Sequence, residues 1–270
     1  MNTCNNCNKL INKSKHKNCK HLFCDMKCRD EFRRKQIPTF PCDNCSTLIT
    51  KQKKGEHLFC DLKCRDEFRR RKYIILHSTF EDHKDEAAYL LGLIMGDGHF
   101  KRSGDETTRI SIAFNVTDFR AINIAESVFQ KLQIQHFVEA KTPHNCKTMG
   151  FVLPNDLLSR FGLLFHGNKF DNQPSCPKEA VHNLHFAVGL LNSDGCFYKH
   201  PDGRHTTISF VNTVGSIITD IKECLKYNDI EFKEYKYIHK KPSWKPMITI
   251  SVAKKTSKEK ILANEYCKWS

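Results

Sequence analysis

Tyr89-Leu-Leu-Gly-Leu-Ile-Met-Gly-Asp-Gly98 is an apolar stretch that ends in an acidic residue and a glycine, and Phe186-Ala-Val-Gly-Leu-Leu-Asn-Ser-Asp-Gly195 repeats the pattern 97 positions later. Both stretches are apolar enough to form buried helices. The carbonyl end of a helix carries about half a negative charge, so a carboxylate there is repelled unless a cation lies nearby. Asp97 and Asp194 therefore predict a cation site if the two helix ends meet.

Small residues recur four positions apart on one face of each predicted helix. That spacing lets two helix backbones approach closely. If the helices pack on each other, Asp97 and Asp194 emerge side by side. Their carboxylates, together with the helix-end carbonyl oxygens of Gly96 and Ser193, form an all-oxygen set of ligands that suits Mg²⁺. The small residues are Gly92 and Gly96 in the first stretch and Gly189 and Ser193 in the second.

The same order of elements follows both stretches, which predicts an α+β fold with two pseudo-symmetric αββαββα halves. The strand over 107–116 alternates apolar with polar side chains, which is typical of a sheet with one buried face. We expect helices on that face and a saddle-like polar surface left for a ligand. A polar turn is expected around 101–105. The other predicted ranges are 119–132, 155–165, 177–194, 216–226 and 256–267 for helices and 136–142, 147–153, 205–212, 231–239 and 246–253 for strands.

The N-terminal region is a tandem repeat, because residues 21–34 recur at 57–70 with one change. In each copy a Cys-x-x-Cys pair precedes a Cys-x-x-x-Cys pair at a predicted helix start. Four thiolates suit tetrahedral zinc, and a unit of about 35–40 residues needs such a metal to fold. The arrangement resembles treble-clef zinc fingers over residues 1–72. The predicted ligands of two structural Zn²⁺ ions are Cys4, Cys7, Cys24 and Cys28, then Cys42, Cys45, Cys60 and Cys64.

Charge is unevenly distributed along the 270 residues. The chain has 44 Lys and Arg against 30 Asp and Glu, a formal net charge of +14, and residues 1–78 hold 19 of the basic and 8 of the acidic side chains. Such an excess favours a polyanionic partner such as nucleic acid. No apolar run approaches the ~18–20 residues of a membrane-spanning helix, and no apolar signal region opens the sequence. We therefore expect no membrane partner and an intracellular protein.

These features divide the chain into five parts. Residues 73–85 are apolar at first and then acidic and polar, and we interpret them as a linker. The zinc modules are expected over 1–36 and 37–72, and the two motif-containing halves over 86–174 and 175–270.

Leu90-Leu-Gly-Leu-Ile-Met-Gly-Asp-Gly98 and Ala187-Val-Gly-Leu-Leu-Asn-Ser-Asp-Gly195 resemble the paired motifs of LAGLIDADG homing endonucleases in their single-chain, two-motif form. The resemblance covers about residues 80–270. It implies that Asp97 and Asp194 bind Mg²⁺ or Mn²⁺ and that each of two active sites hydrolyses one strand of double-stranded DNA. It also implies that polar side chains of the sheets distinguish base pairs in the major groove. The predicted DNA-contacting residues are Arg109, Ser111, Asn115, Lys141 and Lys147 in the first half and Arg204, Thr207, Ser209, Lys236 and Lys245 in the second.

Members of this family often place a lysine near each active site, after the last helix of a half. Lys169 stands at that place in the first half, and Lys268 is a looser counterpart in the second. The resemblance implies that such a lysine stabilises charge or positions water. Met95 and Asn192 depart from the family pattern, at a motif position that is often acidic.

The resemblance implies a site-specific, double-strand DNA endonuclease that acts as a monomer and is encoded in a mobile intron, an intein or a free-standing element. We expect the zinc modules to extend the DNA contact, with docking of a protein as the rival role. Two alternatives remain open for the whole chain: an RNA maturase that helps an intron fold, and a DNA-binding regulator that does not cut. Retention of both aspartates argues against the regulator, because carboxylates repel phosphates when no metal is bound.

Overall fold

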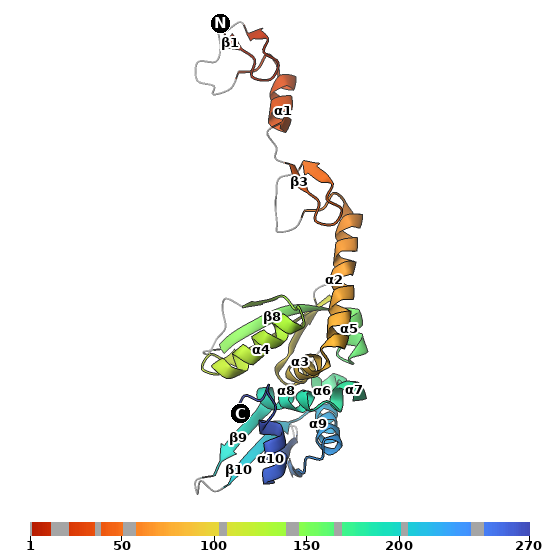
Figure 1. The fold of residues 1–270 in the computed structure, drawn as a ribbon, viewed down its shortest axis with the longest axis vertical. Coiled ribbons are helices and arrows are strands. Elements are labelled where there is room, and N and C mark those ends of the chain that lie inside the picture. The colour runs from red at the N-terminus through yellow and green to blue at the C-terminus, as the bar shows by residue number, and fades with distance from the viewer. Residues whose placement is uncertain are drawn as a thin grey trace. The chain divides into compact units, whose positions relative to one another are not determined.

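The computed structural model describes residues 2–11, 22–35, 39–50, 58–102, 107–138, 146–164, 169–200, 205–238 and 246–270. The chain divides into two compact units, Met1–Tyr73 and Ile74–Ser270, which are described separately. Both combine helices with antiparallel strands (Figure 1). The α+β class expected from the sequence is confirmed. Within the described residues, no helix is long and apolar enough to cross a membrane.

The N-terminal unit contains the same small module twice, a hairpin followed by a helix. Asp25 and Asp61 fix the helix starts, because each accepts a 2.7 Å hydrogen bond at Oδ1 from the backbone N–H three residues later, as N-cap residues do. The elements are β1 (Asn2–Thr3), β2 (Leu10–Ile11) and α1 (Met26–Lys35), then β3 (Thr39–Pro41), β4 (Leu48–Thr50) and α2 (Leu62–Asp82).

The linker was predicted over residues 73–85, but residues 73–82 form the C-terminal part of α2. Phe80 is buried and its ring lies 5.8 Å from that of Phe161, while Arg160 donates a 2.7 Å hydrogen bond to Glu81. No Gly or Pro stands between Leu62 and Asp82, so no residue with a strong helix-breaking preference interrupts the helix. Residues 74–82 therefore belong to the C-terminal unit, and Leu76, Phe80 and Glu81 contact its other elements.

The C-terminal unit repeats one plan. In each half a motif helix leads into a four-stranded antiparallel sheet, ordered β5-β6-β8-β7 in the first and β9-β10-β12-β11 in the second. The first half comprises α3 (Lys84–Asp97), β5 (His99–Arg102), β6 (Thr107–Asn115), α4 (Phe119–Lys131), β7 (His136–Val138), β8 (Cys146–Pro154) and α5 (Asn155–Arg160), and α6 (Lys169–Asn172) follows it. The second comprises α7 (Lys178–Val181), α8 (Leu184–Asp194), β9 (Gly195–Lys199), β10 (Thr206–Asn212), α9 (Gly215–Tyr227), β11 (Lys233–Tyr237), β12 (Met247–Val252) and α10 (Lys255–Leu262).

Several boundaries differ from the predicted ones; the helix predicted over 155–165, for example, ends at Arg160. Strand β5 includes Lys101 and Arg102 of the stretch 101–105 that was predicted as a polar turn, and the other residues of that stretch lie outside the described ones. The helix predicted over 177–194 is two helices, because Asn183 is extended and caps α8 by accepting a hydrogen bond from the His185 N–H. The last helix ends at Leu262 rather than at 267.

The core lies between the sheets and the helices, with α3 and α8 side by side where the halves meet (Figure 1). Residues 86–95 of α3 and 186–192 of α8 are buried. In β6 the buried side chains are Thr108, Ile110, Ile112 and Phe114, which is the predicted alternation. The opposite side of each sheet, which we call its open face, points away from this core.

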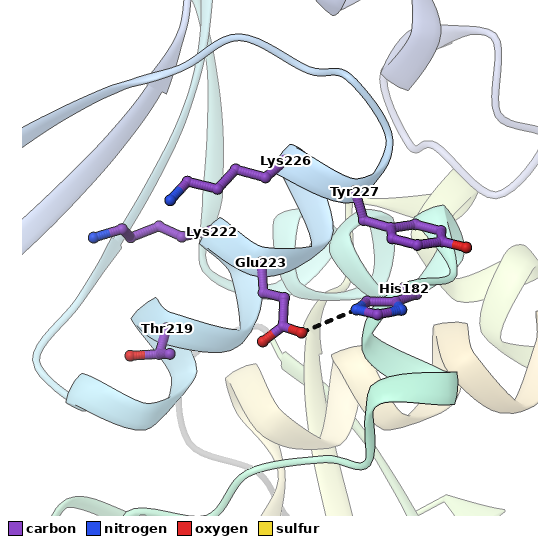
Figure 2. A pocket seen from close by; sticks show the side chains of 6 residues that line it. All are labelled: His182, Thr219, Lys222, Glu223, Lys226 and Tyr227. Carbon is purple, nitrogen blue, oxygen red and sulfur yellow. Dashed lines mark hydrogen bonds and ion pairs between the residues drawn. The ribbon is translucent and has the colours of Figure 1, made fainter.

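A surface hollow of about 580 Å³ lies beside α9 in the second half (Figure 2). The rings of His182 and Tyr227 stack there at 4.0 Å, and His182 Nε2 lies 2.9 Å from Glu223 Oε1. Neither Asp97 nor Asp194 lines the hollow, so it is not the site that the sequence predicts.

Candidate functional site

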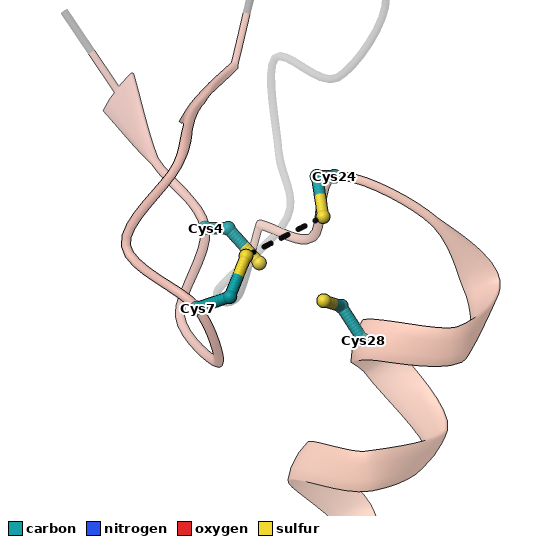
Figure 3. A group of neighbouring side chains, drawn as sticks. All are labelled: Cys4, Cys7, Cys24 and Cys28. Carbon is teal, nitrogen blue, oxygen red and sulfur yellow. Dashed lines mark hydrogen bonds between the residues drawn. The ribbon is translucent and has the colours of Figure 1, made fainter.

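Each N-terminal module brings its four predicted cysteines together, and Figure 3 shows the group of the first module. The four Sγ atoms of each group lie within 4.8 Å of one another. The Sγ atoms of Cys7 and Cys24 are 3.6 Å apart, and those of Cys45 and Cys60 are 3.7 Å apart. Sulfurs around a tetrahedral Zn²⁺ with Zn–S bonds of about 2.3 Å lie about 3.8 Å from one another. Both groups therefore have the composition and the spacing of a structural zinc site.

Backbone N–H groups prepare one thiol in each module for metal binding. Burial opposes ionisation of Cys4, but the amides of Cys7, Asn6 and Cys24 outweigh it and lower the pKa of Cys4 to about 6. The pKa of Cys42 is lowered to about 6 in the same way. Since zinc binds the thiolate, these amides favour the ligand form of the side chain before metal arrives.

In the C-terminal unit, Gly92 and Gly189 face each other where α3 crosses α8. A Cβ added to Gly92 would lie 2.2 Å from the Phe186 carbonyl oxygen, and one on Gly189 would lie 2.1 Å from the Tyr89 carbonyl oxygen. Neither distance is possible for a real side chain, so the two backbones are in direct contact through these glycines. The small residues have the packing role that their spacing predicts.

This packing brings the two aspartates together at the carbonyl ends of α3 and α8. A Cβ added to Gly96, the residue before Asp97, would lie 3.6 Å from Asp194 Oδ2, and the charge of Asp194 acts on Asp97. Asp97 keeps contact with solvent, yet partial burial and then the charge of Asp194 raise the pKa of Asp97 to about 6. Burial also raises the pKa of Asp194, against the effects of Lys169 and Asn212. The pair therefore carries negative charge that its surroundings leave partly uncompensated.

A lysine ammonium lies on each of these helix ends. Lys169 Nζ, at the start of α6, donates to the carbonyl oxygens of Met95 (2.9 Å) and Gly96 (2.5 Å). Lys268 Nζ donates to the carbonyl oxygen of Asn192 (2.6 Å). Met95 and Asn192 hold the same position in the two motifs, so the two ammonium groups are pseudo-symmetric. Burial lowers the pKa of Lys169 to about 8, against the charges of both aspartates.

Asn212 is a site residue that sequence reasoning missed. Its Nδ2 donates a 2.9 Å hydrogen bond to Asp194 Oδ2, and its Oδ1 accepts one of 2.8 Å from the Val214 N–H. The strand register places Phe114 at the equivalent position of the first half. The sequence signal that could have revealed Asn212 is a polar residue at the end of a strand, on the face that is otherwise buried and apolar.

The oxygens that the sequence proposes as metal ligands are of the type that suits a hard divalent cation, but they are few. The two aspartates supply two carboxylates, so water or substrate phosphate would complete the coordination, as Mg²⁺ allows. The Gly96 carbonyl oxygen already accepts a hydrogen bond from Lys169, so it would contact both the metal and the ammonium group. The Ser193 hydroxyl donates to the Leu190 carbonyl oxygen at 2.8 Å, which leaves the Ser193 carbonyl as the oxygen proposed for metal.

The open face of the first sheet carries three of the predicted DNA-contacting residues. Arg109, Ser111 and Asn115 alternate with the buried side chains of β6, and the register adds His99 and Lys101 of β5 to their side. The Arg109 guanidinium lies 4.4 Å from the centre of the Phe137 ring. The Asn115 Oδ1 accepts from the Thr117 N–H and hydroxyl, so this side chain also shapes the turn after β6.

The open face of the second sheet carries Thr207 and Ser209, as predicted. Tyr198 pairs with Thr207, and Tyr235 and Tyr237 lie on the same face of the edge strand β11. These three tyrosines, each about half exposed, were absent from the sequence prediction. Because only one in two residues of a strand faces a given side, the register was needed to find them.

Two predicted contacts lie on the opposite face from the one expected. Lys147 pairs with the buried Phe114 and donates a 2.7 Å hydrogen bond to Glu126 of α4. Lys236 pairs with Ile248, on the side of the sheet that α9 covers. Lys141, Arg204 and Lys245 lie outside the described residues.

No family model and no curated protein matches the chain, whereas solved structures do. Mesophilic variants of the homing endonuclease I-DmoI match with a TM-score of 0.43 and 13% identity, covering 69% of this chain and 96% of that one. I-DmoI in complex with DNA and Mn matches with a TM-score of 0.41 and 14% identity, covering 67% of this chain and 98% of that one. Full-length DUF199/WhiA from Thermatoga maritima matches with a TM-score of 0.44 and 13% identity, covering 67% of this chain and 54% of that one. Similarity at this level carries no functional assignment.

Proposed function

We propose that this protein is a divalent-metal-dependent endonuclease that cuts both strands of a specific DNA site, as the LAGLIDADG-like motifs imply. The observation that carries the proposal is the meeting of Asp97 and Asp194 at the ends of α3 and α8, with an ammonium group on each end. Two carboxylates held together against their own repulsion, beside two lysines, fit a site that binds metal and phosphate.

Mg²⁺ or Mn²⁺ bound by the two carboxylates would supply the Lewis acidity that phosphodiester hydrolysis requires. Lys169 and Lys268 would offset the negative charge that develops on the phosphate. Burial lowers the pKa of Lys169 to about 8, so this amine stays mostly protonated near pH 7, which is the form that offsets the charge. The open faces of the sheets would contact the flanking DNA.

The contact surface that we propose contains the predicted residues that lie on the open faces and the further ones that the register adds. Hydroxyl, guanidinium and imidazole groups can distinguish base pairs in a major groove. Tyrosine rings add apolar contact area with a hydrogen-bonding tip. The surface comprises His99, Lys101, Arg109, Ser111, Asn115, Tyr198, Thr207, Ser209, Lys233, Tyr235 and Tyr237.

The test uses duplex DNA that carries the uninterrupted form of the locus in which the gene lies. We expect double-strand cleavage that requires Mg²⁺ or Mn²⁺, and none from a variant with both Asp97→Asn and Asp194→Asn. Duplex binding without cleavage at any metal concentration would favour the non-cleaving regulator. Tight binding of intron RNA without cleavage of DNA would favour the maturase.

For the zinc modules we propose an extended contact with DNA phosphates. Their basic excess, 19 basic against 8 acidic side chains over residues 1–78, supports this role. Removal of residues 1–72 should weaken DNA binding and reduce the slope of affinity against salt concentration, because fewer counterions are released. An unchanged slope would leave protein docking as their role.

A further inference from the structure

The segment after α10 leaves the second half and packs on the first. Tyr266 and Cys267 are buried, and the Tyr266 hydroxyl donates a 2.6 Å hydrogen bond to Glu86 of α3. Lys131 of α4 donates to the Tyr266 hydroxyl (2.8 Å) and to Glu86 (2.6 Å). An ion pair with a buried carboxylate and a half-exposed ammonium, which share the Tyr266 hydroxyl, thus fixes this segment to the opposite half.

Asn192 holds the backbone of the same segment from the other side. The side chain is buried, with 4% exposure. Its Nδ2 donates to the Tyr89 hydroxyl (2.9 Å) and to the Tyr266 carbonyl oxygen (2.6 Å), and its Oδ1 accepts from the Lys268 N–H (3.1 Å). A primary amide can donate to a carbonyl and accept from an amide two residues later at the same time. Three of its four hydrogen-bonding positions are used.

These contacts direct the Lys268 side chain back onto α8. Its Nζ donates to the Asn192 carbonyl oxygen and lies 3.6 Å from Asp118 Oδ2. Only 15% of the side chain is exposed, and its charge acts on Asp97 of the other half. Asn192 therefore contacts Lys268 twice. Its side-chain Oδ1 accepts from the Lys268 backbone N–H, and its backbone carbonyl oxygen accepts from the Lys268 ammonium.

The first half holds its ammonium differently. Met95 occupies the motif position of Asn192, and a thioether side chain cannot hold a backbone in this way. Lys169 is carried instead on α6, next to the same carbonyl position. We propose that Asn192 is a positioning residue of the second half-site, which fastens residues 266–268 so that the Lys268 ammonium stands at the end of α8. This inference rests on the proposed nuclease function.

The first experiment needs neither DNA nor cleavage. Hydrogen exchange of the Lys268 amide is compared in the wild-type protein and in Asn192→Met, which installs the residue of the first half. Loss of the 3.1 Å hydrogen bond should speed exchange by about three- to tenfold. Met95→Leu is the matched control and should leave the rate unchanged. Equal exchange in wild type and Asn192→Met overturns the proposal.

The second experiment measures the cleavage rate of each DNA strand on a duplex that the wild type cuts. Asn192→Met and Lys268→Met should slow the same strand by about tenfold or more and change the other less. The double variant should be no slower than the slower single one, and Lys268→Arg should recover part of the rate. If Asn192→Met slows both strands equally, or if the two effects multiply, Asn192 has only a structural role.

Failure of the proposed function is a separate result. If the wild type cuts no duplex, the nuclease proposal fails, and the hydrogen-exchange comparison alone decides whether Asn192 fastens the segment.

Discussion

At the ends of α3 and α8, two carboxyl groups lie close enough for the charge of Asp194 to act on Asp97, where each helix already adds about half a negative charge. Lys169 and Lys268 offset part of this repulsion from the carbonyl side. Asn212 contributes on one side only, because the apolar Phe114 stands at its equivalent position. The two aspartates are therefore related by pseudo-symmetry without having equal surroundings.

Asp97→Asn should stabilise the protein when no divalent cation has been added. The folded pKa of about 6 lies above the ordinary value of 3.8 for an aspartate, so ionisation of Asp97 increasingly weakens the folded state as pH rises from about 4 to about 6. Above pH 6 the penalty is constant. After allowance for solvent screening, we expect a gain of about 1 kcal/mol in the free energy of unfolding at pH 7.5 and almost none at pH 4. Urea denaturation at both pH values measures it, and a lower stability at pH 7.5 would contradict this reading.

Asn212→Leu should raise the pKa of Asp194 further, because the Nδ2 hydrogen bond to Asp194 favours the ionised form. Protons would then compete with metal up to a higher pH. Calorimetric titration with Mn²⁺ between pH 5 and 8, without DNA, should show the onset of binding moved upward in this variant. Ser209→Ala, on the open face of the same strand, serves as control. A pH dependence identical to that of wild type would mean that Asn212 does not tune the site.

Among the elements, the crossing of α3 and α8 decides whether the two halves form one site. The glycines there allow backbone contact, and the aspartates follow five residues later in both helices. Any increase in the distance between the helices would separate the carboxylates. The geometry of the site therefore depends on the absence of side chains at Gly92 and Gly189.

Gly92→Ala should destabilise the C-terminal unit although alanine favours helix. The added methyl would lie 2.2 Å from the Phe186 carbonyl oxygen, and overpacking of this kind costs about 1–3 kcal/mol or more. Gly215→Ala in α9 is the matched control, because its nearest neighbour is a Gln173 side-chain oxygen at 3.3 Å. Thermal unfolding should show a fall for the first variant and a small change for the second. Equal effects would contradict direct backbone contact.

The strands show why the open faces were only half predictable. The alternation in β6 assigned Arg109 and Ser111 correctly, because its buried positions are all apolar or Thr. The prediction was wrong for Lys147 and Lys236, because a lysine can lie on the helix-facing side of a strand when its long aliphatic part carries the ammonium group to a polar partner or to water. Lys147 reaches Glu126 in this way, and Lys236 is exposed. One polar residue cannot reveal the side of a strand; the pairing register does.

On the scale of the whole molecule, the duplications made most of the architecture predictable. The repeated motif fixed the pairing of Asp97 with Asp194, and the repeated cysteine spacing fixed both thiol groups. The roles of Asn212 and of Asn192, which holds residues 266–268, could not be predicted, because each depends on contacts between residues far apart in the sequence. Tyr266 meets Glu86 across 180 positions, and no local pattern encodes such a contact.

Removal of zinc should affect the two units unequally. Modules of this size lack a sufficient core, and the described part of the C-terminal unit contains no comparable cysteine cluster. A chelator should therefore abolish hydrogen-exchange protection in α1 and around Cys42–Cys64 while protection of α3 and α8 persists. Protection retained around the cysteines after the metal content has fallen to zero would contradict a structural role for zinc.

We propose that Asp97 and Asp194 meet at one pseudo-symmetric centre whose two active sites each cut one strand and each need both aspartates. The most direct test of this proposal is strand-resolved cleavage of a target duplex by wild type, Asp97→Asn and Asp194→Asn in the presence of Mg²⁺. We predict that the wild type cuts both strands and that each single variant leaves at most a nick. Double-strand cleavage at the wild-type rate by either single variant would contradict the claim.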